Sequence, residues 1–128
     1  MINILTGVVA SISSWVLNKL FLSKLGAKAV IYLIPLEEEV LKTGLAYYLE
    51  ADLISTHLVF GLLEASFDFV YSNSLAALLA LLTHLLLGLL TVYLWQGSDN
   101  LIVAVAIAVL VHAVWNYSIR RSDHEIDL

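Results

Sequence analysis

Five long apolar stretches, each able to cross a lipid bilayer as a helix, dominate this sequence of 128 residues. A spanning helix needs roughly 20 mostly apolar residues, because each residue adds about 1.5 Å and the hydrocarbon core is about 30 Å thick. We predict spans at 4–21, 29–49, 53–71, 75–95 and 100–119. The expected connections are short: 22–28, 50–52, 72–74 and 96–99. Residues 120–128 are polar and are expected to fray. The sequence therefore predicts an all-α, polytopic membrane helix bundle that forms one transmembrane domain over residues 1–128.

The composition supports lipid as the solvent of this chain. It is 61% hydrophobic and 13% charged, whereas soluble domains average about 45–50% apolar and about 25% charged residues. The length fits one domain, so the chemistry of this chain has to come from its membrane helices and short loops. A net charge of -5 without a basic patch argues against nucleic acid as a partner. The absence of cysteine excludes disulfides and thiolate catalysis.

Basic residues predict the orientation in the membrane. Lys19, Lys24 and Lys28 flank the first connection, and Arg120 and Arg121 begin the tail. With five spans, these two regions lie on the same side of the bilayer. Because cytoplasmic loops are enriched in lysine and arginine, the N-terminus is expected outside and the C-terminus in the cytoplasm. We therefore expect a multi-pass protein of the cell membrane.

Several ionisable side chains lie at the depth of the bilayer centre. Such a residue costs roughly 2.5–3.5 kcal/mol on insertion scales and usually faces the protein interior. Five of them lie within about two residues of the midpoints of their predicted spans, hence in a slab about 6 Å thick: Glu38, Glu39, Glu64, His84 and His112. Such alignment on four separate helices indicates a functional cluster.

The rotation per residue around a helix predicts which of the three consecutive glutamates face the same side as Lys42. Glu38 and Lys42 are four residues apart and share a face. Glu39 is rotated by about 100° from Glu38, and Glu37 is rotated equally the other way, so we expect Glu37 to be peripheral. Pro35 cannot donate a backbone hydrogen bond, so it is expected to kink or open this helix just before the acids.

The net charge of the cluster indicates that it contains a shared proton or a bound cation. Glu38, Glu39 and Glu64 with Lys42 sum to a net charge of about -2 if all are ionised. We therefore expect a shared proton or a bound cation among them.

Three further ionisable residues are expected to be secondary. His57 and Asp68 lie towards the ends of their predicted span, where His57 is expected to face the outer interface and Asp68 to lie near the cytoplasmic interface, and His124 belongs to the polar tail.

The cluster residues form four motifs in order along the chain. They are an EExxK motif at Glu38–Lys42, an FxxxE motif at Phe60–Glu64, a lone His84 and an HxxxN motif at His112–Asn116. This order resembles the PrsW family of intramembrane proteases, and more widely the group of CAAX-processing endopeptidases and bacteriocin-immunity proteins (CPBP/Abi). That wider group shows EExxxR and FxxxH, so Glu64 and the EExxK spacing favour the PrsW side. The final asparagine is a departure, since PrsW-type proteins more often carry aspartate there.

The resemblance implies hydrolysis of a peptide bond within or near the membrane. Glu38 would be the general base that activates water, and Glu64 would hold or polarise that water. His112 and Asn116 would donate hydrogen bonds to the developing oxyanion, an interaction that often supplies a large part of catalysis. The substrate would be a membrane protein or a membrane-associated peptide.

The resemblance also implies supporting roles. His84 would orient the water or the substrate, and Glu39 and Lys42 would form an ion pair. Phe60 would pack in the core.

The charge balance can also be met by a metal ion. The group has been described both as glutamate-type and as metal-dependent proteases, and zinc is the alternative that the residues permit, ligated by Glu38, Glu64, His84 and His112. Because the sequence has no HExxH motif, we favour glutamate-activated water without a cofactor.

Two other functions remain open at this stage. Buried glutamate and histidine side chains also serve as proton relays in transporters and channels. A non-catalytic membrane interaction or immunity protein could share the same fold. Five short helices make a small enclosure, so a homodimer is a further expectation.

Overall fold

The structure is a computed structural model that describes the backbone of residues 1–126 and the side chains of residues 1–26 and 28–119. Over this range the predicted all-α fold is confirmed. The five helices are α1 (Ile2–Leu25), α2 (Ala27–Tyr48), α3 (Leu53–Tyr71), α4 (Ser74–Ser98) and α5 (Leu101–Ile126). Four of them, α1, α3, α4 and the part of α5 over Leu101–Ile119, are long and apolar enough to cross a membrane. The remaining helix, α2, spans 22 residues and carries the charged cluster.

The helices begin and end close to the predicted positions, with two exceptions. The predicted connection 22–28 is helical except at Gly26, whose backbone has φ +57° and ψ -146°. Only glycine adopts this conformation without strain, so one residue suffices for the turn. Helix α5 continues to Ile126 instead of fraying after residue 119, and no glycine or proline interrupts that stretch. The side chain of His124 and residues 127–128 lie outside the described part.

Helix α2 is not opened at Pro35. It runs as one helix from Ala27 to Tyr48 with Pro35 inside it, and Pro35 is fully buried. The ring packs into the bundle while its neighbours keep helical geometry. Access to the acidic residues therefore comes from between helices rather than through a break in α2.

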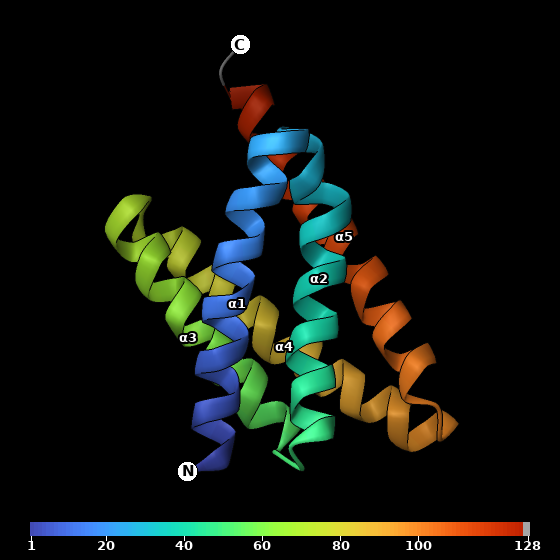
Figure 1. The fold of residues 1–128 in the computed structure, drawn as a ribbon. Helices are drawn as coiled ribbons and strands as arrows, with labels where there is room; N and C mark the ends of the chain where they lie inside the picture. The colour runs from blue at the N-terminus through green and yellow to red at the C-terminus, as the bar shows by residue number, and fades with distance from the viewer. Residues whose placement is uncertain (127–128) are drawn as a thin grey trace.

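The helices pack as two antiparallel pairs and a fifth helix (Figure 1). Helices α1 and α2 stand side by side, α3 and α4 cross behind them at an incline, and α5 lies beyond α2. Helix α2 contacts α1, α3 and α5, and helix α3 contacts α1, α2 and α4, so these two helices are the central elements. The turn between α1 and α2 lies at the same end of the bundle as the last turns of α5, opposite the N-terminus (Figure 1).

The interior reverses the usual arrangement of a soluble domain. Its fully buried apolar residues are small, such as Ala10, Ala46 and Ala104, whereas the largest fully buried side chains include Lys42 and His84. Large apolar side chains lie on the outside over all five helices. Small residues between helices and apolar side chains outside are the arrangement that lipid favours. The polar cluster is thus the core of the bundle.

Candidate functional site

A buried ion pair lies at the centre of the cluster. Lys42 Nζ lies 2.6 Å from Glu39 Oε1, and both side chains are 0% exposed. The spacing is three residues along α2, so Lys42 pairs with Glu39 and not with Glu38, which is four residues away. The ion pair implied by the resemblance is therefore present. It brings a cation into the bundle, where an isolated charge is costly.

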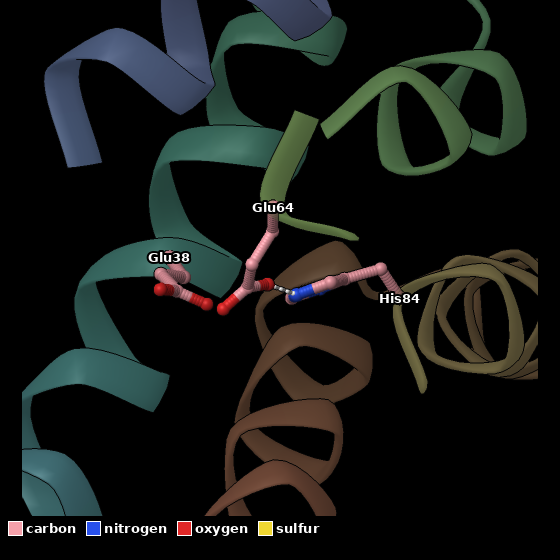
Figure 2. Close-up of side chains that lie close together, drawn as sticks. All are labelled: Glu38, Glu64 and His84. Carbon is pink, nitrogen blue, oxygen red and sulfur yellow. Dashed lines mark hydrogen bonds and ion pairs between the residues drawn. The ribbon is translucent and has the colours of Figure 1, made fainter. Parts of the chain in front are cut away.

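Lys42 also fixes the hydrogen bonding of His84. Lys42 Nζ lies 2.8 Å from His84 Nδ1. Because an ammonium group only donates, Nδ1 is the acceptor and the ring proton resides on Nε2. His84 Nε2 in turn contacts Glu64 Oε2 and donates to it (Figure 2). The phenyl ring of Phe60 packs edge-on against His84, with ring centroids 4.9 Å apart.

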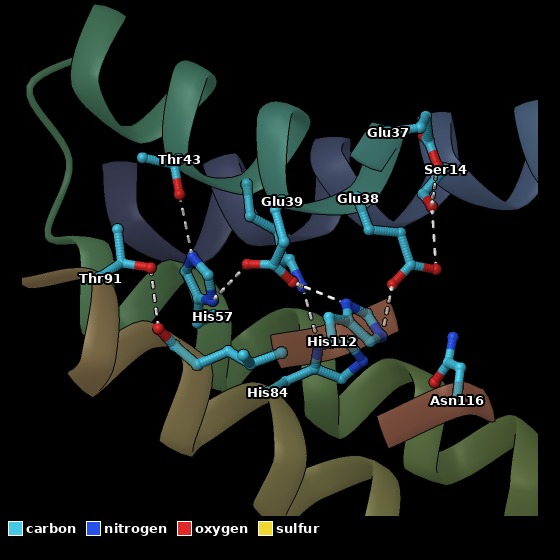
Figure 3. A network of polar contacts seen from close by, with 12 residues as sticks. Ser14, Glu37, Glu38, Glu39, Thr43, His57, His84, Thr91, His112 and Asn116 are labelled. Atoms are coloured by element: carbon cyan, nitrogen blue, oxygen red, sulfur yellow. Dashed lines mark hydrogen bonds and ion pairs between the residues drawn. The ribbon is translucent and has the colours of Figure 1, made fainter. Parts of the chain in front are cut away.

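His112 is hydrogen-bonded to the carboxylate of Glu39, which also pairs with Lys42. Its Nδ1 lies 2.9 Å from Glu39 Oε1. Its Nε2 points the opposite way and lies 3.9 Å from Glu38 Oε2 (Figure 3). Glu39 therefore orients the imidazole, and Nε2 is the ring atom left for chemistry.

Glu38 has one satisfied and one unsatisfied oxygen. Oε1 accepts hydrogen bonds from Asn18 Nδ2 at 3.0 Å and from Ser14 Oγ at 3.4 Å. Oε2 is buried and has no hydrogen-bond partner among the described residues. The carboxylates of Glu38 and Glu64 face each other (Figure 2). A buried carboxylate oxygen without a donor is rare in native proteins and marks a place where water, a proton or substrate can bind.

Two partners of Glu38 come from α1, which the motifs did not include. Ser11, Ser14 and Asn18 follow the i, i+3, i+7 spacing of one helical face. That polar stripe within an apolar span is the signal by which they could have been found. Ser14 Oγ also lies 3.1 Å from Oε2 of the half-buried Glu37. Glu37 thus lies at the edge of the cluster, as its phase predicted.

His57 is more buried in the protein than its position near the end of a predicted span indicated. It is fully buried, with Nε2 3.3 Å from Thr43 Oγ1 and Nδ1 4.0 Å from Glu39 Oε2. The expectation of an interfacial His57 is wrong because α4 offers Gly88 at this point. A Cβ atom on Gly88 would lie 2.8 Å from the His57 Cβ, so only glycine lets the imidazole fit.

Asn116 uses its amide for a helix–helix contact. Its Nδ2 donates to the backbone carbonyl of Val30 at 3.0 Å and so joins α5 to α2. One of the two N–H groups of the amide, which the resemblance assigns to an oxyanion, is therefore used in this bond. Asn116 lies one helical turn after His112, so this bond also fixes the position of His112.

Two cavities meet at Glu64. The first has a volume of about 450 Å³, lies between α1, α2 and α3, and includes Glu38, Glu64 and Asp68 in its lining. The second has a volume of about 290 Å³, lies between α3, α4 and α5, and also includes Glu64 and Asp68, together with His112. Glu64 is the accessible member of the cluster, since its side chain is 38% exposed. A water or substrate entering either cavity reaches the Glu38–Glu64 pair.

The expected metal ligands fit a metal ion poorly. Ligand atoms of Glu38, Glu64 and His84 lie within 4.8 Å of one another, and His112 is not part of that group. A metal-bound histidine usually donates its second ring N–H to an acceptor. Here the second nitrogen of His84 faces Lys42, which can only donate to it. The hydrogen-bond order therefore places a proton on the nitrogen that a metal would need.

No family model, no curated protein and no solved structure matches this chain. What the cluster can do chemically therefore rests on its own geometry.

Proposed function

We propose that this chain is an intramembrane peptidase of the PrsW-like type, in which Glu38 activates a water molecule. The observation that carries the proposal is the buried, unpartnered Oε2 of Glu38, which faces Glu64 at the wall of a cavity. A general base must be within hydrogen-bond reach of the water it deprotonates and must have a lone pair free. Glu37 Oε1 and Glu39 Oε2 are likewise buried without a hydrogen-bond partner among the described residues, but of these three acids only Glu38 lines the cavity that also contains Glu64.

In the proposed reaction, water binds between Glu38 Oε2 and the carboxylate of Glu64. Glu38 takes one proton from the water as its oxygen attacks the scissile carbonyl carbon. A protonated His112 donates its Nε2–H to the resulting oxyanion, and Glu39 stabilises the imidazolium through Nδ1. The C–N bond then breaks, and Glu38 returns its proton to the leaving amine nitrogen.

The remaining residues position these groups. Lys42 sets the tautomer of His84, and His84 holds Glu64 by its Nε2–H. Asn116 is assigned to holding α5 against α2 rather than to direct contact with the oxyanion. With His112 protonated, the net charge of Glu38, Glu39, Glu64, Lys42 and His112 becomes about -1 instead of about -2, which lowers the electrostatic cost of the buried cluster.

Cleavage by the purified, reconstituted protein tests this proposal. The substrates would be transmembrane peptides with a fluorophore and a quencher on opposite sides of the bilayer centre. We expect Glu38→Gln to lower the rate by about 10²–10⁴-fold, the usual contribution of a general base, and Glu64→Gln and His112→Ala to lower it too. The control is Glu50→Gln, an exposed acid in the turn before α3. Wild-type rates in all three cluster variants would rule out the assignment.

A proton-translocating protein is the second candidate. The observation that favours it is the continuity of polar contacts from Thr43 through His57, Glu39 and Lys42 to His84. Proteoliposomes loaded with a pH-sensitive dye would separate the two functions. Proton flux that is lost in His57→Gln, which interrupts this chain of contacts, in a protein without peptidase activity, would favour translocation.

We propose the cell membrane as the location, with the N-terminus outside. The support is the clustering of Lys19, Lys24 and Lys28 around the Gly26 turn. Because the chain has no cysteine, a single cysteine can be introduced at Ser23 or at Ser98 without background. A membrane-impermeant thiol reagent added to intact cells should label Ser98→Cys and spare Ser23→Cys. The reverse pattern would overturn the orientation.

A further inference from the structure

The cavity between α1 and α3 has an excess of negative charge. Three carboxylates line it, those of Glu38, Glu64 and Asp68, and the basic residue in its lining is Lys19. Lys19 Nζ lies over the Trp15 ring, 3.5 Å from its centroid. Within the described side chains, Lys19 makes no ion pair with any of the three acids. The cation in the cavity lining is therefore held by an aromatic ring and is not paired with these acids.

A second, independent feature points to a ligand in this cavity. Glu38 is 2% exposed, and its Oε2 lies in the cavity wall without a hydrogen-bond partner among the described residues. The carboxylate of Asp68, which is half-buried, likewise has no hydrogen bond or ion pair in the described part of the chain. The cavity lining thus contains two acids that each have a carboxylate oxygen without a hydrogen-bond donor among the described residues.

The cavity lining also contains aromatic side chains. Trp15 of α1 stacks with Phe67 of α3, with ring centroids 6.5 Å apart, and Phe67 stacks with Tyr71 at the same distance. Aromatic faces attract cations and pack against the aliphatic stems of lysine and arginine. A lining that combines carboxylates with aromatic rings suits a long basic side chain.

The spacing between the acids matches an extended peptide. Asp68 follows Glu64 by one helical turn, which is about 6 Å along α3. An extended chain advances about 3.3 Å per residue, and side chains two residues apart point the same way. A residue two positions from the bond that faces Glu38 and Glu64 would therefore lie opposite Asp68.

Building on the proposed peptidase function, we propose that this cavity selects substrates with a lysine or arginine two residues from the scissile bond, paired with Asp68. Asp68 is then a specificity-determining residue. Substrate enters between α1 and α3, past Trp15 and Phe67.

Binding tests the selectivity without requiring cleavage. Three transmembrane peptides differ only at one position, which is lysine, glutamine or glutamate, and their affinity is measured by energy transfer in nanodiscs of zwitterionic lipid. We expect the lysine peptide to bind about tenfold more tightly than the glutamine peptide, the effect of one charge-assisted pair. Asp68→Asn should remove that preference, whereas Glu50→Gln should keep it. Equal affinity of all three peptides for the wild-type protein would overturn the proposal.

A charge reversal sharpens the test. Asp68→Lys should shift the preference from the lysine peptide to the glutamate peptide, a result that a general loss of folding cannot produce. Unchanged preference in both Asp68→Lys and Asp68→Asn would also overturn the assignment of Asp68.

The two proposals fail in different ways. Selective binding of the lysine peptide without cleavage of any peptide would support the cation-selective cavity and contradict the peptidase function. Cleavage of all three peptides at one rate and with one affinity would contradict the selectivity and leave the peptidase function standing.

Discussion

Glu38 and Glu39 are neighbours on α2, but they belong to two different halves of the buried cluster. The closed half consists of Glu39, Lys42, Thr43 and His57, all 0–1% exposed. The open half consists of Glu38, Glu64 and Asp68, which line the cavity between α1 and α3. Glu38 and Glu39 differ by about 100° of rotation around the helix. The comparison shows that the helices a carboxylate faces, rather than its depth or residue type, decide whether its charge is paired or left free.

The largest effects are expected when each of the two glutamates is replaced by glutamine and the free energy of unfolding is measured. Glu39→Gln leaves the Lys42 charge buried without its partner, so we expect a loss of about 3–5 kcal/mol in the free energy of unfolding. Glu38→Gln removes a carboxylate with a free oxygen and leaves Asn18 an acceptor, so we expect a change below about 1 kcal/mol. Denaturation in mixed micelles gives both values.

The opposite ranking, with Glu38→Gln the more destabilising, would contradict the division into closed and open halves. A matched check is the rate of peptide cleavage by the folded fraction. Glu38→Gln should be folded and inactive, whereas Glu39→Gln should lose activity in step with its folded population.

The second effect concerns the ion pair as a unit. Lys42→Met alone should cost about 3–5 kcal/mol, because Glu39 then keeps a buried charge with only histidine partners. The double variant Glu39→Gln/Lys42→Met leaves neither charge of this ion pair without its partner. It should be more stable than either single variant, and a double-mutant cycle measures the coupling. Additive losses would mean that the pair contributes nothing to the closed half.

The sequence predicted the fold well because hydrophobic length alone decides it. Stretches such as 53–71 have the length and apolarity of a span, and helix α3 has the same bounds. Of the five residues predicted from their depth, Glu38, Glu39, His84 and His112 are buried, whereas the side chain of Glu64 is partly exposed. Both inferences need only the distance along the chain and the thickness of a bilayer.

The pairing inside the cluster could not be predicted in the same way. His57 was placed near the interface because a linear midpoint treats helices as upright, yet α3 and α4 are inclined to α1 and α2 (Figure 1). Lys42 can reach acids three or four residues away, and the choice of Glu39 depends on His84 and His112 of other helices. Ser14 and Asn18 lay outside the motifs, although they share a helical face.

The third comparison is between a glycine beside His84, which holds Glu64 of the open half, and a glycine beside His57 of the closed half. A Cβ atom on Gly61 would lie 2.9 Å from the Cβ of His84, and one on Gly88 would lie 2.8 Å from the Cβ of His57. Both alanine variants should lose about 1–3 kcal/mol through overpacking. Because His84 holds Glu64, we expect Gly61→Ala to lower the cleavage rate of the folded protein, and Gly88→Ala to leave it near the wild-type value.

Gly44→Ala on α2 is the control for the glycine comparison, since a Cβ atom there meets nothing within 4 Å. It should be neutral or stabilising by up to about 1 kcal/mol, the difference in helix propensity. If Gly88→Ala slowed cleavage as much as Gly61→Ala, the closed half would take part in the reaction and the comparison would lose its functional meaning.

The smallest effect is expected at Asn116, which lies outside both halves and joins α5 to α2. Its bond to the Val30 carbonyl should contribute about 0.5–1.5 kcal/mol, so Asn116→Ala should lower stability by that amount. Asn116→Asp should be worse, since a carboxylate has no N–H and would face a carbonyl oxygen. A direct oxyanion donor would behave differently, because its removal typically lowers kcat by about 10²–10³-fold with the fold intact. Stability and kcat measured on the same two variants therefore decide between the anchoring role and direct catalysis: a stable Asn116→Ala with such a loss of kcat would return Asn116 to the reaction itself.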